Sequence, residues 1–198
     1  MSQVRATEGI VDVWHADLAA AQNRFDDLLC AQEHERARQM LSERKRQLWI
    51  GSRAVLRALL GRYLDRDPRE LRFTLGPHGK PALHQEAAEG ADPPDLRFNL
   101  SHSGDLVLVA VTAGREVGVD IEHARERYTA SFLRAWVARE AAVKCHGTGL
   151  GAPHADAFAA GLWSTGLDAG DGAVAAVAVQ GGEECQLRCW QVPALSST

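Results

Sequence analysis

Hydrophobic and polar positions alternate with two different periods along the chain, and each period predicts a different element. Residues 10–14, IVDVW, alternate as a strand does. Residues 33–64 carry apolar side chains at helical spacing, from Leu41 to Tyr63, and contain no proline. This predicts one long amphipathic helix or two abutting helices. Asp67-Pro68 ends the region because proline disfavours helical geometry in the residue before it.

The middle of the chain is predicted to form strands joined by turns. LRFTLGPHGKPAL, residues 71–83, predicts two short strands around a glycine-proline turn. Residues 85–95 are acidic, small and proline-containing, which is typical of a surface loop. LRFNL, DLVLVAVTA and VGVDIE follow within residues 96–122 and predict three strands, the last two of which form a hairpin.

The last third of the chain predicts a second helix and two more strands. Residues 131–145 favour a helix that is capped by Ser131 and ended by Gly147 and Gly149. AVAAVAVQ and CQLRCWQV, which flank GGEE, predict a final β-hairpin. The order of strand, long helix, strands, helix and strands indicates a mixed α+β fold.

Length, charge and cysteine spacing narrow the class of protein. The 198 residues suffice for one domain or for two small ones that share an interface. The net charge of −4 does not favour general nucleic-acid binding, yet seven basic residues crowd positions 36–57 and suit a local anion site. The four cysteines form no CxxC pair, so we expect buried, reduced thiols instead of a zinc site.

Nothing in the hydropathy pattern indicates a membrane or secreted protein. No stretch approaches the ~18 consecutive apolar residues that a membrane-spanning helix needs. The first residues lack the basic region and long apolar run of a secretory signal. We therefore expect a cytoplasmic protein without a membrane partner.

Asp120 and Glu122 lie two residues apart on the predicted strand VGVDIE, so both side chains project from the same face. Two neighbouring carboxylates repel each other unless a cation lies between them. Oxygen ligands of this kind suit Mg²⁺, which neutralises charge on phosphoryl oxygens. The alternative is a pair of solvated acids at the end of an exposed strand.

The predicted helix 131–145 offers further groups for the same site. Trp136, Glu140 and Lys144 are spaced i, i+4 and i+8, so they lie along one face. That face can supply a third carboxylate to a metal and an ammonium to a phosphate. The alternative is an ordinary surface ion pair between Glu140 and Lys144, and composition does not choose between the two.

Two turns carry candidate anion ligands. Ser101 and His102, in the sequence NLSHSG, are adjacent, and a strand would aim them oppositely, which disfavours a catalytic triad. Each can instead hydrogen-bond a phosphate or a ribose, or simply cap the turn. Lys80 stands in a rigid Gly-Lys-Pro turn, which suits an anion contact, although a lone turn lysine is more often plain surface.

Taken together and in this order, the motifs resemble the larger, monomeric class of phosphopantetheinyl transferases, of the surfactin-synthetase-activating type. The matching stretches are GKPAL at 79–83, FNLSHSG at 98–104, VGVDIE at 117–122 and WVAREAAVKCHGTGL at 136–150, with a similar basic helix before them. The resemblance covers most of residues 10–150. One departure is the segment between Glu122 and Trp136, which is shorter than the family's usual helical insert.

The resemblance implies a fold and a reaction. The fold would be a pseudo-twofold α+β monomer of two similar α/β subdomains, each a small, mostly antiparallel sheet packed on a long helix. The boundaries would be 1–116 and 117–198, with the active site in the cleft between them. The reaction would transfer the 4′-phosphopantetheine arm of coenzyme A to a serine of an apo acyl or peptidyl carrier protein, as a holo-acyl-carrier-protein synthase does, and release 3′,5′-ADP.

The resemblance also implies roles for single residues. Asp120, Glu122 and Glu140 would hold Mg²⁺ against the pyrophosphate, and Glu140 would act as base for the carrier serine. Lys144 would contact the pyrophosphate and assist the leaving group. The residues expected at the 3′-phosphoadenosine end of coenzyme A are Arg36, Lys80, Ser101 and His102.

Two other functions remain open from the sequence. A non-catalytic coenzyme A-binding relative would keep the fold and add no phosphopantetheine to any carrier, although it would be expected to lack at least one of the three acids. A Mg²⁺-dependent phosphodiester hydrolase would use the same acids and turn over coenzyme A or nucleotides without a carrier. The ordered GKP and SHSG motifs favour the transferase over the hydrolase.

Overall fold

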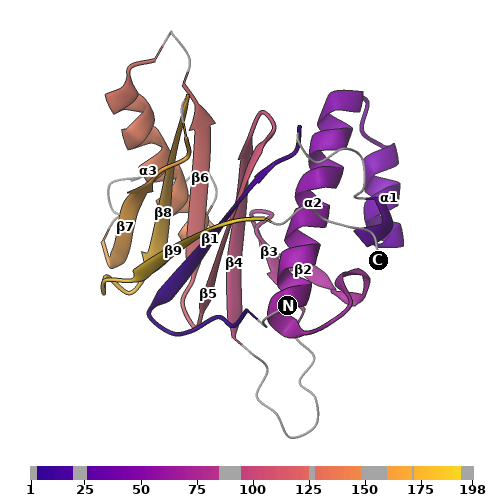
Figure 1. The fold of residues 1–198 in the computed structure, drawn as a ribbon, viewed down its shortest axis with the longest axis horizontal. Coiled ribbons are helices and arrows are strands. Elements are labelled where there is room, and N and C mark those ends of the chain that lie inside the picture. The colour runs from indigo at the N-terminus through magenta and orange to yellow at the C-terminus, as the bar shows by residue number, and fades with distance from the viewer. Residues whose placement is uncertain are drawn as a thin grey trace, which may run out of the picture.

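The computed structural model describes residues 4–19, 26–84, 95–124, 128–148, 160–170 and 172–192. Two sheets stand face to face, with one long helix outside each of them (Figure 1). The strands are β1 (Ile10–Asp17), β2 (Phe73–Leu75), β3 (Pro81–Leu83), β4 (Leu96–Ser103), β5 (Leu106–Ala113), β6 (Val117–His123), β7 (Leu162–Leu167), β8 (Ala173–Gln180) and β9 (Gln186–Gln191). The helices are α1 (Ala31–Arg38), α2 (Glu43–Leu64) and α3 (Ala130–His146), with short 3₁₀ turns η1 (Asp26–Leu28) and η2 (Pro68–Glu70).

The first sheet has the strand order β4-β5-β1-β9, and the second has the order β6-β8-β7. All neighbours in these two sheets are antiparallel except β1 and β9, which are parallel. β2 and β3 form a separate hairpin. The predicted mixed α+β class is therefore confirmed.

Two predicted hairpins are wrong. β6 was expected to pair with β5, but it lies in the second sheet and bonds β8. β8 and β9 were expected to pair with each other, but β9 crosses to the first sheet and adds beside β1. The crossing is anchored by buried Asp12, whose carboxylate accepts hydrogen bonds from Arg188, Trp190 and Tyr63 at 2.6–2.9 Å. The last strand thus belongs to the sheet of the first, while the division at residue 116 stays a prediction.

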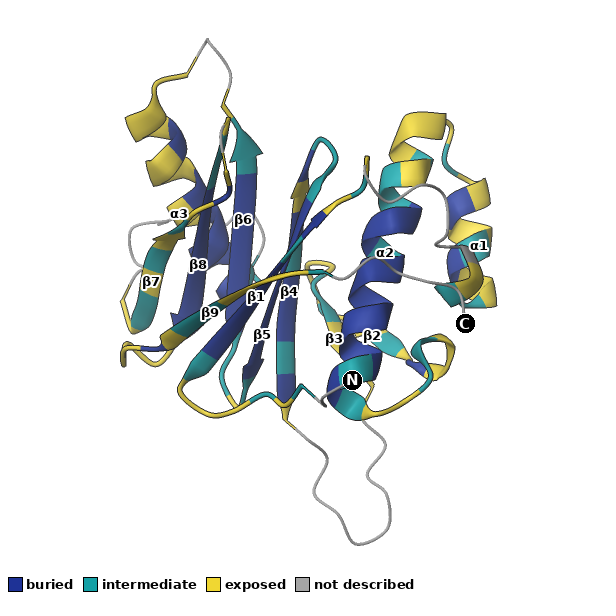
Figure 2. Cartoon of the chain, viewed as in Figure 1, coloured by how far each residue is buried: buried dark blue, intermediate teal, exposed yellow. Residues whose placement is uncertain are grey.

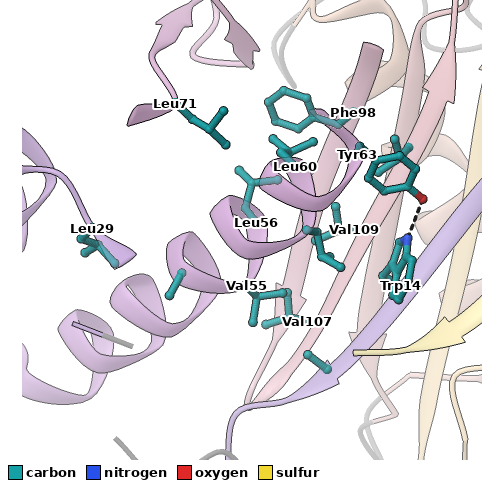
Figure 3. Close-up of a cluster of buried hydrophobic side chains, with 14 of the residues drawn as sticks. Trp14, Leu29, Val55, Leu56, Leu60, Tyr63, Leu71, Phe98, Val107 and Val109 are labelled. Carbon is teal, nitrogen blue, oxygen red and sulfur yellow. Dashed lines mark hydrogen bonds between the residues drawn. The ribbon is translucent and has the colours of Figure 1, made fainter. Parts of the chain in front are cut away.

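The hydrophobic core consists of three clusters. One lies between α2 and the first sheet, one between the two sheets, and one between the second sheet and α3. Val107 and Val109 of β5 face α2, and they pack with Val55, Leu56 and Leu60 (Figure 3). Val111 belongs to the same cluster. Leu108 and Ala110 face the second sheet instead. This is why residues 106–111 are apolar without alternation. The cluster between α3 and β8 contains Ala141, Ala176 and Ala178, among others.

Small residues let α3 approach the second sheet closely. A Cβ atom on Gly118 would lie 2.0 Å from the carbonyl oxygen of Ala141 and 2.3 Å from the amide nitrogen of Cys145. Only glycine fits at this point of β6, because both obstacles are backbone atoms of the helix. Gly118 shares a strand face with Asp120 and Glu122, so the same close contact brings α3 to the two carboxylates.

Helix boundaries differ in detail from the predicted ones. The basic region forms two helices, and residues 39–42 separate them with Ser42 capping α2. Leu41 therefore lies fully exposed in the break and not on the apolar stripe. The cap of α3 is Thr129, not Ser131, and Gly147 ends the helix with a φ of +66° as expected. Gly149 and most of the predicted loop at 85–95 lie outside the described residues.

Burial follows the layers, with α2 and the central strands enclosed and the outer helix faces exposed (Figure 2). The cysteines follow the prediction only in part. All four are free thiols, and Cys145 and Cys185 are buried, but Cys189 is exposed. No helix in the described part of the chain is both long and apolar enough to span a bilayer.

Candidate active site

The two sheets meet at their edge strands, β4 and β6, which are joined by side chains and not by a backbone ladder. Asn99 Oδ1 accepts a hydrogen bond from the backbone amide of Val119 at 3.0 Å. Ser103 Oγ accepts one from the backbone amide of His123 at 3.1 Å. These side chains satisfy buried amides that the missing ladder would leave without partners. The polar positions of β4 therefore seal two open sheet edges.

Two serines on the same face of β4 hydrogen-bond the two predicted acids, which lie on β6. Ser101 Oγ donates to Asp120 Oδ1 at 2.8 Å, and Ser103 Oγ donates to Glu122 Oε2 at 3.2 Å. Asp120 and Glu122 project from one face of β6, as the alternation predicted, while Val119 and Ile121 enter the core between the sheets. Asp120 is buried, and Glu122 is half-buried.

Helix α3 adds Glu140 and Lys144 to this cluster. Lys144 Nζ lies 2.6 Å from Asp120 Oδ1 and 2.9 Å from Ser101 Oγ. The cluster therefore joins β4, β6 and α3 through one ammonium group. An ammonium has three hydrogens to donate, so Lys144, with a side chain about one third exposed, can still offer one of them to a ligand.

Two carboxylate oxygens of the cluster are buried and accept no hydrogen bond within the described structure: Asp120 Oδ2 and Glu140 Oε1. Burial, followed by the charge of Asp120, raises the pKa of Glu140 above its ordinary value, against the opposing charges of Lys144 and Arg139. Glu122 raises it slightly further. Glu140 is thus a buried carboxyl group whose proton affinity is set by its neighbours, as at many catalytic sites.

The predicted metal ligands were Asp120, Glu122 and Glu140. Across the described residues no three His, Cys, Asp or Glu side chains stand close enough together to hold a metal ion. Lys144 is the cation that lies against Asp120, while Ser103 holds Glu122. The two unpartnered oxygens are nevertheless suitable ligands for a hard cation. The metal assignment of these three residues stays a prediction.

Ser101 and His102 point to opposite sides of β4, as expected from their adjacency. Ser101 joins the carboxylate cluster, whereas His102 lines a groove on the other side. Desolvation of its ring, and next the charge of Lys144, lower the pKa of His102 below its ordinary value, with Glu122 acting in the opposite direction. His102 therefore connects the groove electrostatically with the cluster.

The groove has a volume of about 1660 Å³ and runs from α1 past the β2–β3 hairpin to His102. Arg36 and Trp49 lie at its α1 end, where the guanidinium stands 5.8 Å from the ring centroid. The described lining is strongly basic, although the whole chain is mildly acidic. Its arginines are Arg36, Arg53, Arg57, Arg66, Arg69 and Arg72.

Two of these arginines form ion pairs with Glu33 in the wall of the groove. Arg57 is buried and donates to Glu33 Oε2 at 2.5 Å, and Arg53 bonds Glu33 Oε1 at 2.8 Å. Burial favours a higher pKa for Glu33, but the hydrogen bond from Arg57 and the charge of Arg53 hold the pKa below its ordinary value. Both guanidinium groups also stack on Phe73. Arg36, by contrast, is exposed on the groove.

Lys80 is not among the side chains that line the groove. Its ammonium donates to Glu116 Oε2 at 2.5 Å, to Val117 O at 3.1 Å and to Cys145 O at 3.0 Å. Three acceptors use all three of its donor hydrogens. The contacts therefore describe a clamp between the β2–β3 hairpin, β6 and the end of α3, and a coenzyme A contact for Lys80 stays a prediction.

Three residues of this region were not singled out from the sequence: Asn99, Ser103 and Glu116. Asn99, Ser101 and Ser103 alternate in FNLSHS, and this two-residue period signals one polar strand face. No pattern in the sequence singles out Glu116, because its role depends on ion pairs with Lys80 and Arg97, which are distant in sequence.

Comparisons with known proteins point to one family. A family model described as 4′-phosphopantetheinyl transferase, N-terminal, matches residues 14–114, about half of the chain. The 4′-phosphopantetheinyl transferase HetI of Nostoc sp. is 30% identical over 169 residues, which cover 71% of this chain and 70% of the relative. The 4′-phosphopantetheinyl transferase Sfp of Bacillus subtilis is 24% identical over 72% of this chain and 70% of its own length. The 4′-phosphopantetheinyl transferase AcpT of Salmonella typhi is 33% identical over 52% of this chain and 60% of its own length.

Proposed function

The chain belongs to the 4′-phosphopantetheinyl transferase family and transfers a phosphopantetheine arm to carrier proteins, and we propose that coenzyme A is bound along the basic groove with its pyrophosphate at the carboxylate cluster. The acceptor is a serine of an apo acyl or peptidyl carrier protein. Its oxygen forms a bond to the β-phosphorus of coenzyme A, and the bond to the bridging oxygen breaks to release 3′,5′-ADP. The serine loses its proton in the same reaction.

The observation that carries this proposal is the buried carboxyl group of Glu140 beside Asp120 and Lys144. A neutral serine hydroxyl needs a base within hydrogen-bond reach. The raised pKa of Glu140 makes its carboxylate a stronger base than an ordinary carboxylate. We assign Glu140 as the base because its Oε1 is free of other hydrogen bonds within the described structure.

Lys144 is assigned to the charge that develops on the phosphoryl oxygens. Its ammonium is already oriented by Ser101 and Asp120, so little conformational freedom is lost when a phosphate arrives. Asp120 therefore has a positioning role toward Lys144 in addition to its predicted role as a metal ligand. His102 faces the same charge from the groove side.

Asp120, Glu122 and Glu140 are the residues that would hold Mg²⁺. The Oδ2 atom of Asp120, which accepts no hydrogen bond within the described structure, supports this, and so does the raised pKa of Glu140, to which burial and then the charges of Asp120 and Glu122 contribute. When bound, the ion would neutralise charge on the pyrophosphate. The protein's own groups would then orient the phosphate and take the proton.

The basic groove is proposed to hold the 3′-phosphoadenosine end of coenzyme A. Arg36 is exposed there beside Trp49, and it forms no ion pair among the described residues. A guanidinium with free donors suits a phosphate, which it can meet with two hydrogen bonds. The described lining of the groove ends at His102, which is next in sequence to Ser101 of the cluster.

We also propose that the protein acts as a cytoplasmic monomer. The cluster and the groove are both built from one chain, so no second copy is needed to complete the site. The free thiols of all four cysteines agree with a reducing compartment.

The proposal is tested by incubating the protein with Mg²⁺, coenzyme A and several apo carrier proteins. Mass spectrometry of the carrier is expected to show the added phosphopantetheine, with 3′,5′-ADP released in equal amount. Omission of the carrier provides the control for hydrolysis. Release of 3′,5′-ADP without a carrier, or no modification of any carrier, would contradict the proposed transfer.

A further inference from the structure

Helix α1 has little apolar surface with which to pack against the rest of the protein. Of its eight residues, all of which the structure describes, only Glu33 and Ala37 are buried, and their spacing of four places them on one face. Ala37 is its one member of the hydrophobic cluster around α2. A helix of this length is not stable in water by itself. Its position on the outside of α2 (Figure 1) therefore depends strongly on the contacts of Glu33.

The carboxylate of Glu33 joins α1 to α2 through two arginines. Its Oε1 lies 2.8 Å from a guanidinium nitrogen of Arg53, and its Oε2 lies 2.5 Å from Nε of Arg57. Oε2 also accepts a hydrogen bond from the backbone amide of Cys30 at 3.1 Å, at the start of α1. Arg57 in turn donates to two backbone carbonyl oxygens beyond the end of α2. One buried carboxylate thus links α1, α2 and the segment that follows α2.

The charge of Glu33 is unexpected in this place. Glu33 lines the same basic groove as Arg36, and a carboxylate beside an anion site disfavours anion binding. Its two ion pairs take up this charge, and they also engage Arg53 and Arg57. Arg36 remains exposed on the groove, where it forms no ion pair among the described residues. The benefit of an acid here must therefore come from what it holds in place.

Arg36 is the ligand-binding group that the contacts of Glu33 hold in place. It follows Glu33 by three residues, which is about 4.5 Å along the helix axis. Its guanidinium stands 5.8 Å from the ring centroid of Trp49, which belongs to α2. A shift or detachment of α1 would move Arg36 away from Trp49 and from the groove.

We propose that Glu33 is a positioning residue, which docks α1 on α2 and thereby holds Arg36 where it meets the 3′-phosphate of coenzyme A. This inference rests on the proposed function, because it concerns the binding of that reaction's first substrate. Docking of α1 and binding of the 3′-phosphate are then coupled, and each favours the other to the same extent.

The first test measures the Kd of Glu33→Gln for coenzyme A and for 3′-dephospho-coenzyme A by calorimetric titration. The Kd for coenzyme A is expected to rise about tenfold, which corresponds to about 1.4 kcal/mol. The Kd for the dephosphorylated analogue is expected to stay within twofold of the wild-type value. Glu35→Gln, which breaks an exposed ion pair with Arg38 on the same helix, is the matched control and is expected to bind both ligands as wild type does.

A double variant tests whether Glu33 acts through Arg36. Glu33→Gln/Arg36→Ala is expected to bind coenzyme A within twofold of Arg36→Ala alone, because the group that Glu33 positions is already absent. A residue that supports the groove only in a general way would instead add its own loss of affinity to that of Arg36→Ala.

A further measurement needs only the wild-type protein, because Glu33→Gln also removes the counter-charge of buried Arg57 and lowers stability. Amide hydrogen exchange of residues 31–38 is followed at saturating coenzyme A and at saturating 3′-dephospho-coenzyme A. Exchange is expected to be about tenfold slower with coenzyme A, because the 3′-phosphate favours the docked helix by the factor that docking gives to its binding.

Three results would overturn the inference. They are equal weakening of both ligands by Glu33→Gln, independent effects of Glu33→Gln and Arg36→Ala in the double variant, and equal exchange of residues 31–38 with the two ligands. Each of them leaves the proposed function intact if the wild-type protein modifies a carrier. A wild-type protein that binds no coenzyme A would remove the proposed function, and this inference with it.

Discussion

Lys144 Nζ lies 2.6 Å from Asp120 Oδ1, so an ammonium stands beside the carboxylate that is proposed to bind a divalent cation. Two cations that use the same carboxylate compete for it, unless the lysine shifts toward the phosphate when the metal arrives. The ammonium of Lys144 therefore lies beside the buried carboxyl group before any ligand is bound. Breaking such a pair from one side leaves an uncompensated charge.

This relationship predicts the effect of Lys144→Met on metal binding. Removal of the ammonium leaves Asp120 beside Glu140 without its present counter-charge, so Mg²⁺ is expected to bind several-fold more tightly in the absence of coenzyme A. The rate of transfer is expected to fall by about a hundredfold or more, because the group that meets the phosphoryl charge is lost.

Calorimetric titration of the folded variant with Mg²⁺ measures the first effect independently of activity. Arg134→Met, which removes an exposed charge from the same helix, is the matched control. An affinity for Mg²⁺ that is equal in Lys144→Met and in wild type would count against a shared site.

Gly118→Ala is expected to lower both the free energy of unfolding and the kcat. The added methyl group would overlap the backbone of Ala141 and Cys145, which cannot move without shifting α3 from β6. We expect a loss of about 3 kcal/mol in the free energy of unfolding, at the upper end of the usual cost of overpacking. Glu140 and Lys144 would shift with the helix, so kcat is expected to fall even at temperatures where the variant is folded.

The matched control for this substitution is Gly166→Ala in the same sheet. A Cβ atom on Gly166 meets nothing closer than 4.0 Å. Chemical denaturation of both variants measures the difference. Equal stability of the two proteins would show that the contact between Gly118 and α3 is not as tight as described.

Lys80→Met distinguishes a structural clamp from a ligand contact. The substitution leaves the carbonyl oxygens of Val117 and Cys145 without their charged donor, and among the described residues Glu116 then keeps Arg97 as its ion-pair partner. We expect the free energy of unfolding to fall by about 2 kcal/mol, the typical cost of losing hydrogen bonds from a charged group. The KM for coenzyme A is expected to change little at a temperature where the variant is fully folded.

The opposite outcome for Lys80→Met is equally informative. A rise in the KM for coenzyme A with no loss of stability would return Lys80 to the 3′-phosphoadenosine site that the motif suggests. Arg97→Met, which also removes a cation from Glu116, is the control.

Arg36→Ala is expected to weaken the binding of coenzyme A and to leave the binding of 3′-dephospho-coenzyme A unchanged. The residue stands exposed on the groove, and we assign it to the 3′-phosphate. Its loss is expected to raise the KM for coenzyme A about tenfold, while the KM for 3′-dephospho-coenzyme A stays unchanged. Arg38→Ala, on the same helix but paired with Glu35, is the control. Equal effects on both substrates would contradict the assignment to the phosphate.

Local features of the fold could be predicted from the sequence because they depend on neighbouring residues. The period of VGVDIE placed Asp120 and Glu122 on one face and their valine and isoleucine neighbours in the core, and the structure confirms it. The adjacency of Ser101 and His102 correctly separated their directions. Gly147 ends α3 with the left-handed backbone that glycine allows.

Partner choice between distant segments could not be predicted in the same way. β6 follows β5 after a short turn, which favours a hairpin, yet it pairs with β8, and in that place one of its faces packs against the first sheet and the other against α3. The placement of β9 depends on Asp12, which lies 176 residues from Arg188 in sequence. The contacts of Lys80 join three separate segments, so its motif alone gave no indication of the clamp.

The central claim is that Glu140 accepts the proton of the carrier serine. It is tested most directly by the pH dependence of single-turnover transfer in wild type and in Glu140→Gln, at saturating coenzyme A and carrier. Because the pKa of Glu140 is raised, the wild-type rate is expected to fall as the pH falls through that raised value, where the base becomes protonated. Glu140→Gln is expected to transfer about a hundredfold to ten-thousandfold more slowly and to lose this acid limb. A variant that transfers within tenfold of the wild-type rate and keeps the acid limb would contradict the claim.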